Sequence, residues 1–131
     1  MFDLRKIQIE ETVVVAFKDG NGVRYTDEKG EEVGIQAASP TTPRYRKARE
    51  KMQSRFADNA ALPKQKQNKN ILEDVTIGFL KDVAVAPVNF CIDGKDKDET
   101  LKEFLDNLEW RILARQVGDE LIGETNFLPS A

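Results

Sequence analysis

The sequence predicts a single α+β domain that is mostly helical and carries a β-hairpin or meander in its N-terminal part. Two periodicities indicate this class. Between residues 4 and 38, β-branched and other apolar residues recur at alternate positions between glycine-rich turns, which favours strands. From residue 43 onward, apolar residues recur every three or four positions, as on one face of a helix. A length of 131 residues suits one domain with a real core.

The β-rich part covers residues 1–38. Apolar side chains alternate along residues 4–17, and the DGNG sequence at residues 19–22 is a strong turn signal, because Gly and Asn tolerate positive φ. Residues 23–26 are expected to return as a strand and, after a second turn, residues 33–37 to form a third. Such a meander needs helices on its apolar face to be stable.

A basic helix is predicted for residues 43–59. Thr42 suits the N-cap, and Pro43 suits the first helical position, where the missing N–H of proline costs nothing. Residues 60–69 are expected to form a mobile linker, because the run KQKQNK offers no apolar side chain. The helix carries an apolar stripe of Tyr45, Ala48, Met52 and Phe56, surrounded by Arg44, Arg46, Lys47, Arg49, Lys51 and Arg55.

The helical part covers residues 70–131. Asn70 is expected to cap its first helix, in which Gly78 permits close packing against a neighbour. Residues 84–92 are apolar but interrupted by Pro87, which predicts an extended or irregular segment.

Residues 101–127 contain the densest helical periodicity in the chain. Thr100, followed by Glu103 three residues later, spells a capping box. A break between two helices would fall at residues 108–110, where the apolar face shifts. We expect the core to include Ile71, Val75, Phe79, Leu101, Phe104, Leu105, Leu108, Trp110, Ile112 and Val117.

The residue types argue against enzymatic chemistry. Histidine is absent, which removes the commonest general base and metal ligand, and the single cysteine, Cys91, is expected to be buried and inert. The acidic loop at residues 93–99 lacks the ligand spacing of a calcium loop. We therefore expect no catalytic residue, no metal site and no cofactor. No secretory signal or membrane span is visible, so a reducing cytoplasm is the expected location.

The charges are unevenly distributed along the chain. Residues 44–69 carry nine Lys/Arg against two Asp/Glu, whereas residues 70–131 carry six against thirteen. Six cations along residues 44–55 would suit nucleic-acid phosphates. The other interpretation is a solvated face, or one that complements the acidic half of the same chain or of a neighbouring copy. We favour the second interpretation, because the sequence is acidic overall and stacking aromatics are sparse in this helix.

Three groups of residues occur in a characteristic order. The first is the glycine-punctuated hairpin region that ends in Ser39-Pro40 and enters RYRKA at residues 44–48; the second is the run at residues 71–80, followed by Asp93-Gly94. The third comprises Thr100, Phe104-Leu105, Trp110, Gln116-Val117 and Asn126-Phe127-Leu128. In this order the chain resembles the tail assembly chaperones of long, non-contractile-tailed phages, the siphoviruses of the lambdoid-like kind. Similar proteins often carry tryptophan where this chain has Phe79.

The resemblance implies a non-catalytic protein that acts in the host cytoplasm during tail assembly and is absent from the mature virion. Such proteins self-associate, coat the long helical tape measure protein to keep it soluble, and help to recruit tail tube protein. The resemblance also implies a longer product, made by ribosomal frameshifting, that adds a second domain.

Two other functions stay open from the sequence. One is a small nucleic-acid-binding protein that uses the basic helix at residues 44–55, and the other is a structural tail or connector component of the virion. For partner binding we select apolar residues of the basic helix and the C-terminus together with four cations: Met52, Phe56, Phe127, Leu128, Arg44, Arg46, Lys47 and Arg49.

Overall fold

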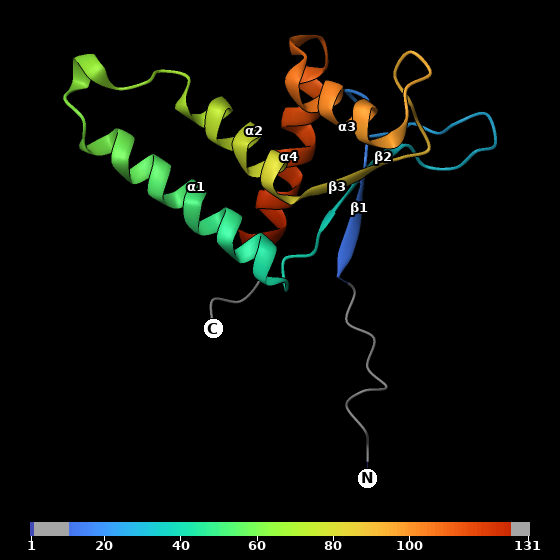
Figure 1. Ribbon diagram of the computed structural model, residues 1–131, viewed down its shortest axis with the longest axis horizontal. Coiled ribbons are helices and arrows are strands. Elements are labelled where there is room, and N and C mark those ends of the chain that lie inside the picture. Colours follow the sequence, from blue (N-terminus) through green and yellow to red (C-terminus); the bar gives the residue numbers. More distant parts are fainter. Residues whose placement is uncertain (2–10, 127–131) are drawn as a thin grey trace.

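The computed structural model describes Met1 and residues 11–126, with side chains as far as Gly123. Its three-stranded antiparallel sheet and four α-helices confirm the predicted α+β class. Helices α1 and α2 lie side by side and extend away from the sheet, whereas α3 and the turns that follow β1 lie on the opposite side (Figure 1). In chain order the elements are β1 (Thr12–Ala16), β2 (Gly34–Ala38), α1 (Pro43–Ala61), α2 (Ile71–Val83), β3 (Ala84–Val88), α3 (Lys97–Asp106) and α4 (Arg111–Asn126).

The sheet has the order β1-β2-β3. Strands β1 and β2 pair in continuous register, whereas the pairing of β2 with β3 is irregular between Gln36 and Ala37. Strand β2 matches the strand expected at residues 33–37, and β3 is the extended part of residues 84–92. Residues 4–10 of the first expected strand lie outside the described residues.

The strand expected at residues 23–26 is wrong. That segment makes only isolated bridges, because it is confined between two tight turns that start at Asp19 and Asp27. Each aspartate side chain accepts hydrogen bonds from the amide nitrogens two and four residues ahead, at 2.8–3.0 Å. Each turn closes through a glycine with positive φ, Gly22 at 80° and Gly30 at 79°.

Most of the residues expected in the core are buried or half-buried, but two of them are exposed. Leu108 and Ile112 are 76% and 87% exposed. After α3, a 3₁₀ turn over Leu108–Trp110 changes the helical phase, so Ala114 and Leu121 take the inner face of α4 instead. The break predicted at these residues is therefore confirmed. The buried members of the expected core are Val75, Phe79, Phe104, Leu105 and Val117, and the half-buried ones are Ile71, Leu101 and Trp110.

Helix α3 begins earlier than the capping-box spelling implied. Asp96 is its N-cap, and the Asp96 carboxylate accepts a hydrogen bond from the amide nitrogen of Glu99 at 2.8 Å. Thr100 is fully buried within α3, and its hydroxyl accepts from the amide nitrogen of Ile92 at 3.3 Å. The Thr100 side chain therefore bonds the preceding loop to α3, and Thr100 is not the residue at which the helix begins.

Cys91 is exposed, which corrects the expectation of a buried thiol. The chain turns at Asn89, whose φ is 60°, directly after β3. Beyond this turn Phe90 and Ile92 pack on the core, and Cys91 between them points outward.

Candidate partner-binding surfaces

The α1–α2 hairpin carries most of the residues that the sequence selected for partner binding. Thr42 caps α1 as predicted, because its hydroxyl oxygen accepts a hydrogen bond from the amide nitrogen of Tyr45 at 3.3 Å. Tyr45 and Ala48 of the apolar stripe are buried. Further along, Met52 packs against the core and Phe56 is half-buried. The stripe mainly holds α1 to the domain, and only parts of Met52 and Phe56 remain for a partner.

The segment expected as a linker, residues 60–69, is an exposed loop with local structure. Helix α1 continues to Ala61, and Lys64–Lys66 form a 3₁₀ turn. The amide nitrogen of Asn68 donates to the side-chain oxygen of Asn59 at 2.8 Å. These features tie the loop to the end of α1 and correct the expectation of a segment without local structure. Its mobility stays a prediction.

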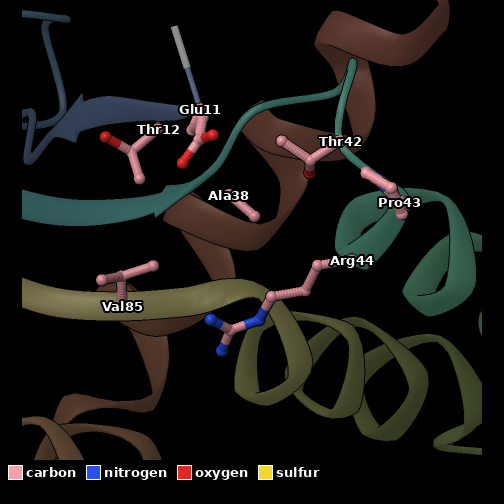
Figure 2. A pocket seen from close by; sticks show the side chains of 7 residues that line it. All are labelled: Glu11, Thr12, Ala38, Thr42, Pro43, Arg44 and Val85. Carbon is pink, nitrogen blue, oxygen red and sulfur yellow. The ribbon is translucent and has the colours of Figure 1, made fainter.

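Arg44 is used inside the protein. Its Nε donates to the carbonyl oxygen of Asp82 at 2.7 Å, and Nη2 donates to that of Ala84 at 3.1 Å. Both carbonyls lie at the C-terminal end of α2, where a cation is favoured by the helix dipole and by unpaired carbonyl groups. Figure 2 shows the Arg44 guanidinium reaching from the start of α1 toward this end of α2. Arg44 is therefore a capping residue more than a free cation.

Two further cations of α1 also lie against α2. The Nζ of Lys51 is 3.4 Å from a carboxylate oxygen of Asp82. A Cβ added at Gly78 would lie only 2.5 Å from Nη1 of Arg55, so Arg55 crosses the surface of α2 at its glycine. The nearby atom is the far end of a flexible side chain that can move aside, so the packing role expected for Gly78 stays a prediction.

The remaining cations of the hairpin face solvent. Arg46, Lys47 and Arg49 are exposed and form no ion pair with any residue that the structure describes. The same holds, within the described residues, for three lysines of the loop that joins the two helices: Lys64, Lys66 and Lys69. We call these six residues the cationic arm.

Helix α3 and the loop before it lie across the molecule from the α1–α2 hairpin (Figure 1) and carry several exposed carboxylates. Two carboxylates of this region are paired, Glu103 with Lys95 and Asp106 with Lys81, the latter at 2.9 Å. The hydrogen bond from Lys95 holds the pKa of Glu103 below its usual value, and the same bond raises the pKa of Lys95. Five exposed carboxylates here have no ion-pair partner among the described residues, and we call them the acidic end: Asp93, Asp96, Asp98, Glu99 and Glu109.

Two hollows open between elements of the domain. One of about 330 Å³ opens between the start of α1 and the sheet (Figure 2). Its ionisable lining residues are Glu11 and Arg44, and Arg44 already bonds the end of α2. Within the described residues there is no cluster of three or more His, Cys, Asp or Glu side chains that could hold a metal ion. None of the described helices is long and apolar enough to cross a membrane.

A second, apolar hollow of about 180 Å³ lies beside the three packed rings of Phe17, Phe90 and Phe104. The Trp110 side chain lines it, and the indole N–H of Trp110 is buried without a hydrogen-bond partner in the described residues. This arrangement contains no nucleophile paired with a base.

Several exposed apolar residues were missed from the sequence. Leu62 and Leu72 border the loop of the arm and are 44% and 53% exposed, because the hairpin extends beyond the core. The sequence did contain a signal for their exposure, because each leucine lies near a helix terminus and close to a run of polar residues. Phe127 and Leu128, the other apolar candidates, lie outside the described residues. Comparison with protein-family models, with curated proteins and with solved structures finds no match.

Proposed function

We propose that this protein is a non-catalytic tail assembly chaperone of a siphovirus, which self-associates and coats the tape measure protein in the host cytoplasm before tail tube protein assembles around it. The observation that carries this proposal is an uneven distribution of unpaired charge. The α1–α2 hairpin carries the cationic arm beside exposed Glu50 and Asp58, and α3 with the loop before it carries the acidic end beside exposed Lys97 and Lys102. The hairpin and α3 lie on opposite sides of the domain (Figure 1). The resemblance in the order of sequence motifs supports the same function.

The charge separation suits head-to-tail association. The arm of one copy meets the acidic end of the next, and a heterologous contact of this kind makes rings or filaments according to whether the rotation closes. Exposed ion pairs are each worth about 0–1 kcal/mol, so charge mainly orients the contact. Most of the affinity must come from apolar surface, for which Leu62, Leu72 and the exposed parts of Met52 and Phe56 are available.

The same arm suits a helical client. A tape measure segment is expected to be a long amphipathic helix, and a groove or face with apolar anchors rimmed by charge is a standard way to bind one. Several copies along one client would cover its apolar stripe and keep it from aggregating.

Pull-down from cells that produce the phage tail proteins tests this function. Wild-type protein should retain tape measure protein, whereas a triple charge reversal, Arg46→Glu with Lys47→Glu and Arg49→Glu, should retain much less. Reversal of Lys29 in the second tight turn is the matched control, because it is an exposed cation outside the arm. Equal retention by all three proteins would exclude the arm as the client surface.

Nucleic-acid binding is the second candidate, because the arm presents six unpaired cations. A protein that neutralises several phosphates loses affinity with a log–log salt slope near −0.9 per contact. We expect no sub-micromolar binding to DNA or RNA at moderate salt. Tight binding with such a slope would favour this candidate over the chaperone. Abundant peptides in purified virions would favour a structural tail or connector component instead.

A further inference from the structure

The two tight turns that follow β1 are built on the same plan. Asp19 and Asp27 each accept two backbone hydrogen bonds on one side-chain oxygen, and the carbonyl oxygen of each accepts a third from the glycine three residues ahead, at 3.0 Å. Both glycines have positive φ, 80° and 79°. The residue before the glycine differs, being Asn21 in the first turn and Lys29 in the second. The aspartate and the glycine therefore set the turn, and its shape does not require asparagine.

The Asn21 side chain is free to react. Asn21 is exposed, and its carboxamide bonds to no residue that the structure describes. The next residue is Gly22, which has no Cβ to hinder the approach of its backbone nitrogen to the carboxamide carbon. The other six asparagines precede Ala, Lys, Ile, Leu or Phe. Asn21 is therefore the asparagine at which attack by the following nitrogen is sterically open.

We propose that Asn21 is a site of spontaneous deamidation, and that the turn over residues 19–22 sets its rate. The backbone nitrogen of Gly22 loses its proton and attacks Cγ of Asn21. The bond from Cγ to the side-chain nitrogen breaks, and ammonia leaves with the displaced proton. The product is a cyclic succinimide, which water opens at either carbonyl group to give aspartate or isoaspartate. Water is the only other reactant.

The closed turn restrains the attacking nitrogen. The N–H of Gly22 donates to the carbonyl oxygen of Asp19 at 3.0 Å. The Asp19 carboxylate also accepts from the amide nitrogens of Asn21 and Val23, which flank Gly22, at 2.8 and 3.0 Å. The Gly22 nitrogen must be released from Asp19 before its proton can leave. Deamidation therefore proceeds from the opened turn, and the population of that state depends on how strongly Asp19 holds the closed one.

Deamidation changes both the charge and the backbone of the turn. Either product adds one negative charge, and isoaspartate also lengthens the main chain by one carbon atom. The turns that follow β1 lie on the same side of the domain as α3 (Figure 1), so the charge is gained on the side of the acidic end. The reaction uses neither the cationic arm nor a partner, and its outcome is independent of the proposed function.

Incubation at mildly alkaline pH, followed by peptide mass spectrometry, tests the site. Folded protein and protein unfolded in urea are incubated side by side. We expect Asn21 to be the first asparagine converted in the folded protein, and to be converted faster in the unfolded one, where the turn is absent. By the time the unfolded chain has converted completely, a measurable part of the folded protein should also have converted. Folded protein that keeps the Asn21 amide, or loses the amide of another asparagine first, would overturn the proposal.

Two aspartate variants test the control by the turn. Asp19→Ala removes both side-chain bonds and keeps the Asn21-Gly22 sequence, so conversion should become about threefold to tenfold faster. Asp27→Ala is the matched control, because it removes the equivalent bonds from the second turn and should leave the rate at Asn21 unchanged. Circular dichroism verifies that both variants fold. An unchanged or slower rate in Asp19→Ala, or the same acceleration in both variants, would contradict the proposal.

Discussion

The hydroxyl of Tyr45 in α1 donates a hydrogen bond to the backbone carbonyl of Leu121 in α4, at 2.7 Å and in a fully buried position. The Tyr45 ring also meets Phe79 of α2 edge to face, with ring centroids 5.2 Å apart. One side chain therefore connects three helices and fixes the direction in which the hairpin leaves the domain.

Tyr45→Phe should lower the free energy of unfolding by about 0.5–1.5 kcal/mol, because it removes the buried hydrogen bond to Leu121 and keeps the ring. Tyr25→Phe is the matched control, since Tyr25 is 51% exposed and its loss of a hydroxyl should change nothing measurable. Urea unfolding of both variants provides the comparison. Equal midpoints for the two would show that the contact between Tyr45 and Leu121 is unimportant.

Gly118 sets the distance between α4 and α2. A Cβ at this position would lie 2.7 Å from Cγ2 of Thr76, so Gly118→Ala should destabilise the protein by roughly 1–3 kcal/mol through overpacking. Gly123→Ala, in the same helix, would meet none of the described atoms within 4 Å and should stabilise by up to about 1 kcal/mol through helix propensity. Thermal melts of the pair measure the difference, and two shifts of the same sign would contradict the packing of α2 on α4.

The corrected core predicts opposite results for two apolar residues of the C-terminal part. Phe104→Ala should cost about 3–5 kcal/mol, because Phe104 is 1% exposed and packs against two other rings. Ile112→Ser should change stability by less than about 0.5 kcal/mol, because the side chain is 87% exposed. Denaturant unfolding checks both. A large loss from Ile112→Ser with no change in Phe104→Ala would reverse the assignment of the inner face.

The pair of Lys95 and Glu103 predicts a local pH dependence. The hydrogen bond from Lys95 lowers the pKa of Glu103, so its contribution to stability is present above the usual pKa of 4.5 and is lost as the pH falls through the lowered value. The raised pKa of Lys95 gives the opposite sign: its contribution is present below 10.5 and is lost as the pH rises through the raised value. An NMR titration of the Glu103 carboxyl should move toward 4.5 in Lys95→Met but not in Lys102→Met. Identical titrations in both variants would rule out the pair.

Periodicity predicted the helices and β2. Helix α2 places a continuous apolar face on the core, whereas α1 buries only Tyr45 and Ala48. Periodicity failed where local geometry interrupts the period. The 3₁₀ turn before α4 rotates Leu108 and Ile112 into solvent, and the left-handed turn at Asn89 does the same for Cys91. The shift of the apolar face predicted the first turn but not which side chains it exposes, and no glycine or proline lies within either turn.

The sequence predicted which segments carry the charged residues of the candidate surfaces, but it did not predict which of these residues make contacts inside the protein. The sequence marked Arg44 and Arg46 alike as cations, yet Arg44 caps α2 and Arg46 faces solvent. Whether a cation of α1 is bonded or faces solvent depends on where α2 ends beside α1. That position is set by tertiary packing, which the sequence pattern does not give. The hydrogen bonds between the Gln116 side chain and the backbone of Lys18 likewise join two segments 98 residues apart in sequence.

Sedimentation velocity of the wild-type protein, alone and with recombinant tape measure fragments at two salt concentrations, tests the chaperone proposal most directly. We expect assemblies larger than a dimer at high protein concentration, and co-sedimentation of several copies with each fragment. Higher salt should slow association more than it weakens the final complex, because charge orients the contact and apolar surface holds it. A strictly monomeric protein with no affinity for any fragment would contradict the proposal.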